Sequence, residues 1–231
     1  MTRRRRIVLA IIATLVFLVL LLPLSLALPM MLPTNSGLSA RMAFGTLWSG
    51  TLRDARLAGL PLGETYVGLL PLPLLVGEAR LKFASPTLRG TLVASQGRFG
   101  IAHATGPIDI AARLRPLPIS QIVLDNARVE FRGRDCVQAE GPVRAVIAGD
   151  VGGIALPGGM TGALRCDGAA LLLPLVGQSG LERLYLRING DGRWRADLSV
   201  RSADAATAAK LIAAGFTTGP RGLSIRMRGT L

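Results

Sequence analysis

The chain has 231 residues and a formal net charge of +13; half of its residues are hydrophobic, 4% are aromatic, and it contains 28 glycines and 14 prolines. This composition is typical of a turn-rich globular chain and excludes a collagen-like or a disordered one. With one histidine and two cysteines, an iron–sulfur cluster held by four cysteines is excluded, and a four-ligand zinc site would need carboxylates. We therefore expect no metal centre and no cofactor.

The chain begins with a basic tail and a long apolar segment. The tail contains four consecutive arginines: Arg3, Arg4, Arg5 and Arg6. The next 26 residues, 7–32, carry no charged side chain. As a helix this segment would be about 39 Å long, more than the roughly 30 Å hydrocarbon core of a bilayer. Pro23 removes a backbone donor, so we expect a kink or a helix end near it.

Arginines next to an apolar span stay on the cytoplasmic side of the membrane. The sequence therefore predicts a cytoplasmic basic tail at residues 1–6, a transmembrane helix at 7–32 and an exported β-rich domain at 33–231. A cleaved signal peptide is the alternative, because Ser25-Leu26-Ala27 places small residues on either side of a larger one. Either way the domain leaves the cytoplasm.

Cys136 and Cys166 both lie in this exported domain. An oxidising compartment favours a disulfide between them. The disulfide would close a loop of about 30 residues and stabilise the domain by roughly 3–4 kcal/mol in the chain-entropy description. Two buried free thiols are the alternative.

A hydrophobic period of two recurs through the exported domain and predicts half-buried strands. Apolar and charged residues alternate in five stretches: 78–83, 108–115, 127–132, 193–201 and 223–228. Glycine-rich breakers lie between such stretches at 59–63, 97–100, 149–159 and 189–192. The last of these, Asn189-Gly190-Asp191-Gly192, contains two hairpin dipeptides, so successive strands should be antiparallel neighbours.

One helix is expected, from about Asp204 to Ala214, with Ser202 or Asp204 as its cap and Gly215 as its stop. Long helices do not alternate with the strands, which excludes a doubly wound fold. We predict a mainly β protein: an N-terminal transmembrane helix, then a long twisted, partly rolled antiparallel sheet with one short C-terminal helix.

The basic residues are mostly arginines placed within the predicted strands. Without the four tail arginines the exported domain keeps a net charge of +9. A nucleic-acid surface would need interleaved aromatic residues or a compact basic cluster, which the sequence lacks, so we expect no nucleic-acid partner. The arginines form either a solvated sheet face or an electrostatic patch for anionic headgroups or an acidic protein.

Catalytic motifs are weak. His103 is the only histidine that could act as a base, and its glycine-flanked polar surroundings indicate a surface or loop residue. Ser49 lacks the G-x-S-x-G frame of a hydrolase. A pair of carboxylates for glycosidase chemistry could come from four residues, although pairing with arginine is their simpler role: Asp135, Glu140, Asp150 and Asp167. We expect that the chain is not an enzyme, with a periplasmic glycan hydrolase as a distant alternative.

One motif, Gly45-Thr46-Leu47-Trp48-Ser49-Gly50, carries one of only two tryptophans. By itself it indicates a strand start at which the ring anchors one face and the glycines allow close backbone approach. Together with the preceding apolar span and the stretch Leu72-Pro73-Leu74-Leu75-Val76-Gly77, it resembles the N component of the bacterial type II secretion system.

The resemblance covers nearly the whole chain as an ordered set of short motifs. After Cys136 and Gly141 these are Leu164-Arg165-Cys166-Asp167-Gly168, Ser179-Gly180-Leu181-Glu182, Gly190-Asp191-Gly192 and Ala214-Gly215-Phe216. The chain departs from the family near Val67 and Gly68, where members often carry a tryptophan.

The resemblance implies a single-pass protein of the bacterial inner membrane with its C-terminal domain in the periplasm. It implies an accessory, non-catalytic component that supports protein export through contacts with other secretion components, made by strand edges or by the basic face. Only the two cysteines and the Gly45–Gly50 motif carry over, as structural features. The alternative is a membrane-tethered β-groove protein that binds or transfers lipid along an open apolar face.

Overall fold

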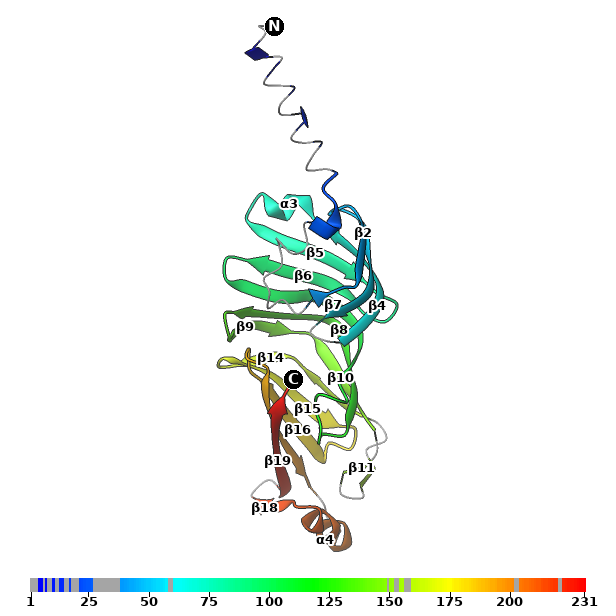
Figure 1. The fold of residues 1–231 in the computed structure, drawn as a ribbon. Helices are drawn as coiled ribbons and strands as arrows, with labels where there is room; N and C mark the ends of the chain where they lie inside the picture. Colours follow the sequence, from blue (N-terminus) through cyan, green and yellow to red (C-terminus); the bar gives the residue numbers. More distant parts are fainter. Residues whose placement is uncertain are drawn as a thin grey trace. The chain divides into compact units, whose positions relative to one another are not determined.

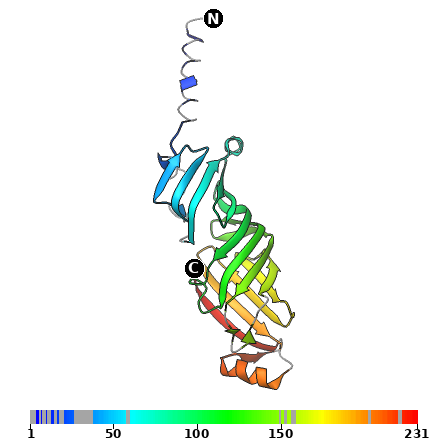
Figure 2. The same ribbon diagram turned by 90° about the vertical axis from the view of Figure 1, so that its right-hand side faces the viewer.

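The computed structural model describes residues 4, 5, 7, 10, 13, 14, 17, 21–26, 38–57, 60–148, 150–151, 154–155, 159–201, 204–219 and 222–231. The chain divides into two compact units, Met1–Pro86 and Thr87–Leu231. Strands predominate in both units (Figures 1 and 2), which confirms the prediction of a mainly β, antiparallel protein with few helices.

The predicted basic tail and transmembrane segment, residues 1–32, lie largely outside the described residues. Within the part of the chain that is described, no helix has both the length and the apolar character needed to cross a membrane.

Unit 1 is a small antiparallel sheet. Its elements are β1 (Leu38–Ser39), β2 (Met42–Gly45), β3 (Gly50–Leu57), β4 (Leu60–Leu69), the one-turn helix α3 (Pro71–Leu74) and β5 (Glu78–Ala84). β1 and β2 pair with opposite ends of β3, and β4 lies between β3 and β5. Part of the apolar segment packs in this unit, because Pro23 forms a β-bridge with Thr46 and the side chain of Leu24 is fully buried.

Unit 2 contains the longer strands and the second helix. Its elements are β6 (Arg89–Ser95), β7 (Arg98–Asp109), β8 (Ile119–Arg132), β9 (Asp135–Glu140), β10 (Pro142–Ile147), β11 (Asp150–Val151), β12 (Ile154–Ala155), β13 (Met160–Ala163), β14 (Arg165–Asp167), β15 (Ala170–Gly177), β16 (Glu182–Ile188), β17 (Arg193–Val200), α4 (Ala205–Ala213), β18 (Thr217–Gly219) and β19 (Gly222–Thr230).

The strands of unit 2 pair mostly with their neighbours along the chain. β6, β7 and β8 are consecutive, and β8 then pairs with β9 through its C-terminal half and with β10 through its N-terminal half. β13 joins β10 to β15, and β16, β17, β19 and β18 follow in that order. The Asn189–Gly192 turn connects β16 and β17, as its two hairpin dipeptides predict.

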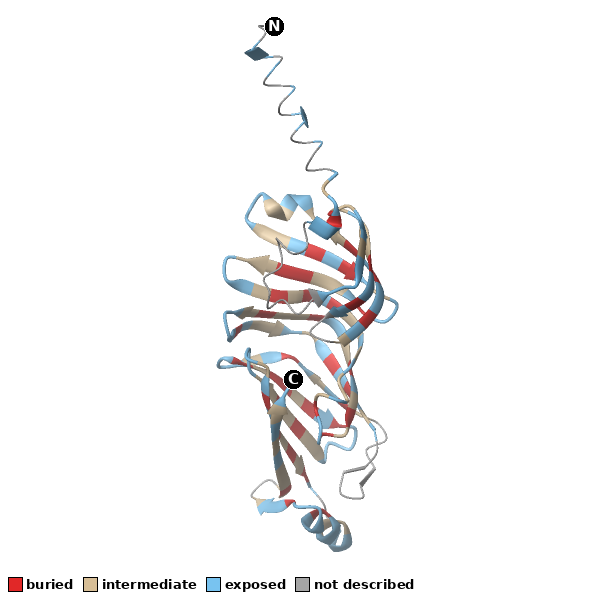
Figure 3. Cartoon of the chain, in the orientation of Figure 1, coloured by how far each residue is buried: buried red, intermediate tan, exposed pale blue. Residues whose placement is uncertain are grey.

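The core of unit 2 lies on one face of these strands. Buried residues alternate with less buried ones along β10, β16 and β17, and the burial of the whole chain is shown in Figure 3; this alternation is expected for strands with one solvated face. Trp194, Ala196, Leu198 and Val200 of β17 point to the core, where Leu211 of α4 also packs.

The predicted C-terminal helix is confirmed, whereas the predicted strand at 108–115 is only partly correct. The helix is confirmed at Ala205–Ala213, with Asp204 as its N-cap and Gly215 at φ +94° after its end; Ser202 lies outside the described residues. The predicted strand at 108–115 is wrong beyond Asp109. The carboxylate of Asp109 accepts a hydrogen bond from the N–H of Ala111, a local turn that ends the strand.

Candidate docking surface

The solvated face of β16, β17 and β19 is rich in arginine. Because side chains alternate between the two faces of a strand, residues between the buried positions of β17 point to solvent, and their cross-strand partners do the same. We call these residues the arginine face: Arg183, Tyr185, Arg187, Arg193, Arg195, Asp197, Ser199, Ser224, Arg226, Arg228 and Thr230.

Three arginines occupy one cross-strand row of this face. Arg195 of β17 lies directly opposite Arg187 of β16 and Arg228 of β19. Like charges placed opposite one another destabilise a sheet, so this row has an electrostatic cost. Among the residues that the structure describes, Arg195 and Arg228 have no carboxylate within ion-pair distance.

Asp197 neutralises part of the face. One carboxylate oxygen lies 3.0 Å from Nε of Arg226, and the other lies 3.7 Å from Nη1 of Arg187. Arg187 also contacts Asp167 at 2.7 Å. The arginine with the most exposed side chain in these pairs is Arg226, at 89%. The face therefore stays net positive with guanidinium groups that solvent can reach.

Two open cavities lie on this face. One, of about 470 Å³, is lined by residues that include Tyr185, Arg187, Asp197, Ser224 and Arg226. The other, of about 410 Å³, includes Arg195, Asp197, Arg226 and Arg228 among its lining residues. Both present guanidinium groups, which suit carboxylate groups of a ligand.

β19 borders the face with an open edge. It pairs with β17 from Leu223 to Thr230, whereas β18 covers only Gly222–Ser224. The N–H of Leu231 donates to the carbonyl of Gly192. The backbone N–H and C=O groups of odd-numbered residues of β19 therefore point toward β17, and those of even-numbered residues point away from it. Within the described part of unit 2, Arg226, Arg228 and Thr230 thus present backbone donors and acceptors without a partner strand.

The Gly45–Gly50 motif forms the turn between β2 and β3, and β3 starts at its last residue, Gly50. The backbones of Thr46 and Ser49 exchange hydrogen bonds of 3.0 and 3.2 Å. Leu47 is the buried residue of the turn, and Trp48 is only half-buried. Gly50 leaves room for the apolar segment, since a Cβ there would lie 2.6 Å from Cδ2 of Leu24.

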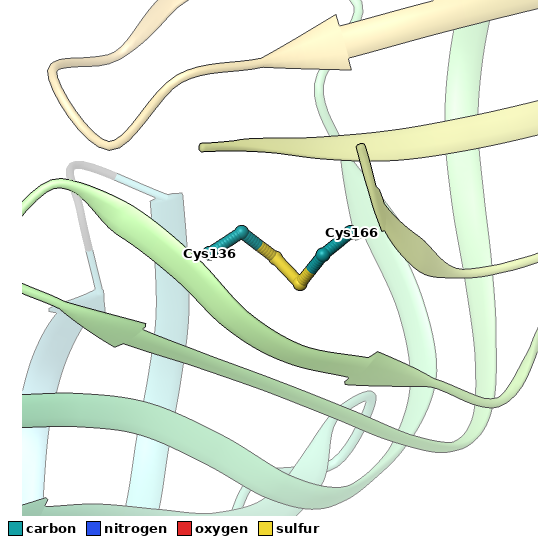
Figure 4. Close-up of a disulfide and its surroundings, with 2 residues drawn as sticks. All are labelled: Cys136 and Cys166. Atoms are coloured by element: carbon teal, nitrogen blue, oxygen red, sulfur yellow. A yellow bond between two sulfur atoms is a disulfide. The ribbon is translucent and has the colours of Figure 1, made fainter. Parts of the chain in front are cut away.

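The two cysteines form a disulfide in unit 2. Cys136 of β9 and Cys166 of β14 have Cα atoms 5.6 Å apart, and Figure 4 shows the bridge between the two strands. The N–H of Cys136 also donates to the carbonyl of Ala169. The bridge therefore holds the β8–β9 hairpin against the β14–β15 hairpin.

Most of the described residues that were considered for catalysis have local partners of their own. His103 lies in β7 at φ +54°, in a bulge, with its ring Nδ1 2.8 Å from Oδ1 of Asn126. Asp167 is paired with Arg187, and Glu140 accepts a hydrogen bond from Gln138. Asp135 begins β9, and the side chain of Asp150 lies outside the described residues.

The family profile described as type II secretion system, protein N, matches residues 36–226. The chain belongs to the type II secretion system protein N family. Neither the curated proteins nor the solved structures contain a match to the chain. Membership of the protein N family gives the chain a role in type II secretion and, with it, interaction with other secretion components.

Two surface features of this protein N family member were not predicted from the sequence: the arginine row and the exposure of α3. Local alternation places arginines on one face of each strand, but only the strand register brings Arg187, Arg195 and Arg228 into one row. The exposure of α3 was also missed, although its prolines and the absence of charge around it were visible. On the apolar face of these strands, Leu184, Leu186 and Leu198 are at most 2% exposed.

Proposed function

We propose that this chain is an accessory, non-catalytic component of the type II secretion machinery, anchored in the inner membrane by its apolar N-terminal segment. Its periplasmic β domain docks an acidic, extended segment of another secretion component along β19. The observation that carries the docking proposal is the arginine row of β16, β17 and β19 beside an open strand edge.

An open edge and a basic face supply complementary parts of a binding site. The outward N–H and C=O groups of Arg226, Arg228 and Thr230 would pair with the backbone of an added strand, as in β-augmentation. The guanidinium groups beside it would select a segment rich in Asp and Glu, because opposite charges across an interface favour the correct partner. Binding would also relieve the repulsion within the row.

The packing of Leu24 supports retention of the N-terminal segment. Cleavage after Ala27 would remove a leucine that is fully buried in unit 1, and also the carbonyl of Leu22, which accepts a hydrogen bond of 3.0 Å from the N–H of Leu47. Loss of a buried leucine side chain typically costs about 2–5 kcal/mol. Cleavage of a signal peptide at this point would therefore destabilise unit 1, whereas an uncleaved anchor keeps these contacts.

The docking proposal is tested by photo-crosslinking in secreting cells. A crosslinking amino acid at Arg228 should capture another secretion component, whereas the same residue at Arg144 should not. Arg144 is a matched control because it is an exposed arginine of β10, an interior strand paired on both sides. Equal crosslinking at the two positions, or none at Arg228, would refute docking at β19.

Charge reversal gives an independent test. Replacing Arg195 and Arg228 by Glu should reduce secretion, replacement by Lys should reduce it less, and Arg144→Glu should leave it unchanged. Native mass measurement of the purified full chain addresses the lipid alternative. Lipid that co-purifies in stoichiometric amount, with secretion unaffected by the charge reversal, would favour a lipid-binding function.

A further inference from the structure

The loop around α3 exposes a cluster of large apolar side chains in unit 1. Leu72, Leu75 and Val76 are 76%, 83% and 77% exposed. No charged residue occurs between Glu64 and Glu78, so the loop lacks the polar side chains of an ordinary solvated turn. We call residues 70–77 the α3 loop. A contiguous exposed apolar patch of this kind marks an interaction site.

The backbone of the α3 loop is also adapted to an apolar environment. Pro71 and Pro73 have no N–H group to satisfy. The N–H groups of Leu75, Val76 and Gly77 donate to the carbonyls of Leu72, Pro73 and Leu74 at 3.1–3.2 Å. Unpaired backbone groups oppose the entry of a segment into a bilayer, so this pairing reduces the cost of insertion.

The α3 loop lies at the end of unit 1 where the apolar N-terminal segment arrives. The N–H of Leu69, just before the loop, donates to the carbonyl of Leu47, whose own N–H donates to the carbonyl of Leu22. Both bonds are 3.0 Å long. Figures 1 and 2 show α3 at the same end of unit 1 as residues 21–26.

Basic residues flank the loop. Arg80 and Lys82 of β5 are exposed, and the carbonyl of Arg80 accepts a hydrogen bond from the N–H of Leu70. An apolar tip with lysine or arginine beside it is the arrangement by which proteins contact anionic bilayers: the apolar groups enter the acyl boundary and the cations stay among the headgroups. Glu78 offsets Arg80 through an ion pair of 2.8 Å, so Lys82 is the principal cation.

We propose that the α3 loop inserts Leu72, Leu75 and Val76 into the interfacial region of the bilayer from which the apolar N-terminal segment emerges. The loop then forms a second membrane contact that fixes the orientation of unit 1 on the membrane surface. This inference rests on the membrane-anchored placement in the proposed function, and it is independent of docking at β19.

The test uses the full chain in vesicles of phosphatidylethanolamine and phosphatidylglycerol. The native cysteines form a disulfide, so Leu75→Cys provides the one free thiol within the described residues for an environment-sensitive fluorophore. Arg56→Cys is the control, because Arg56 is exposed and pairs with Pro61, about 26 Å along β4 from Leu69. We expect a blue-shifted emission and several-fold quenching by lipids with doxyl-labelled acyl chains at position 75, and neither at position 56.

The outcomes separate the two proposals. If the chain floats with the vesicles while the fluorophore at position 75 behaves like that at position 56, the loop proposal is wrong and the anchor stands. If the chain does not float, both the anchor and the loop contact are wrong. A blue shift at position 75 without lipid quenching would assign the loop to contact with a second copy of the chain and overturn insertion.

A triple variant checks the same point without a label at the tip. Leu72, Leu75 and Val76 replaced together by Ser should leave the chain folded, because all three side chains are exposed. With the fluorophore at Ala84→Cys, an exposed position two residues beyond Lys82 in β5, we expect the triple replacement to abolish a several-fold quenching by headgroup-labelled lipid. Unchanged quenching at position 84 would show that the apolar tip does not bring unit 1 to the bilayer.

Discussion

Gly229 lies against the indole ring of Trp194. A Cβ on Gly229 would lie 2.7 Å from Cζ2 and 3.0 Å from Nε1 of that ring, and the two residues are Cα partners across β17 and β19. Trp194 is 1% exposed, so its ring is part of the core of unit 2. Arg193 and Arg195, its neighbours in β17, point to the opposite face. Packing beneath the sheet therefore positions the arginine row above it.

Gly229→Ala is expected to destabilise unit 2 by about 1–3 kcal/mol, because the added methyl group must displace a buried ring. Urea unfolding measured by tryptophan fluorescence checks this. Gly219→Ala is the matched control, since its Cβ would meet only ordinary contacts at 3.6 Å or more. Equal stabilities of the two variants would show that the ring moves aside without cost.

Replacing Cys136 and Cys166 together by Ala is expected to lower the free energy of unfolding by roughly 3–4 kcal/mol, because the unfolded chain loses a cross-link that closes a 30-residue separation. Chemical denaturation of unit 2 in the full chain measures the loss. A reducing agent should destabilise the original protein to a similar extent and leave the double variant unaffected. A reductant effect on both proteins would assign the loss to another cause.

The strands could be predicted from the sequence because a period of two is a local property. It identified β5, β8, β17 and β19, and glycine and cap signals placed the β16–β17 turn and α4. The same local rule failed at 108–115, where apolar residues alternate but Leu114 is buried from a turn rather than a strand. Burial from a loop produces the same alternation as burial from a sheet, so pattern alone could not separate them.

The candidate site was harder to predict because it depends on register. Arg187, Arg195 and Arg228 are separated along the chain, and a shift of one residue in either strand pair would move one of them to the core face. The Gly45–Gly50 motif was noticed for Trp48, yet Leu47 is its buried residue. A tight turn buries whichever side chain its backbone directs inward, and residue size does not reveal that direction.

Leu24→Ala is expected to destabilise unit 1 by about 2–5 kcal/mol, because Leu24 is fully buried next to Gly50. Limited proteolysis of the membrane-embedded full chain measures this as faster cleavage between β1 and β5. Leu26→Ala is the matched control, two residues along and 63% exposed, and should change stability by less than about 0.5 kcal/mol. If both variants resist protease as the original does, residues 23–26 do not contribute to the fold, and cleavage after Ala27 regains its place as an alternative.

The Asp204 carboxylate makes the stability of α4 depend on pH. It accepts hydrogen bonds from the side chain of Thr207 at 2.7 Å and from the N–H groups of Thr207 and Ala206 at 2.8 and 3.2 Å, and these bonds lower the pKa of Asp204 below its ordinary value of 3.8. A carboxylate whose pKa is lowered by folding stabilises the folded state above its unfolded pKa. That contribution is lost as the pH falls through the lowered pKa.

We therefore expect the capping contribution to be complete at pH 7 and to disappear as the solution is acidified below about pH 4. Asp204→Asn should retain a cap through its amide oxygen while losing the pH dependence assigned to this residue, because the amide does not titrate. Asp204→Ala should be less stable than the original protein at pH 7, and the difference in stability should shrink at pH 3. Urea midpoints of the three proteins at pH 7 and pH 3 make the comparison, which other acidic groups do not confound because they are common to all three. If the urea midpoints of the original protein and Asp204→Asn differ by the same amount at pH 7 and pH 3, the charge of Asp204 does not contribute to the cap.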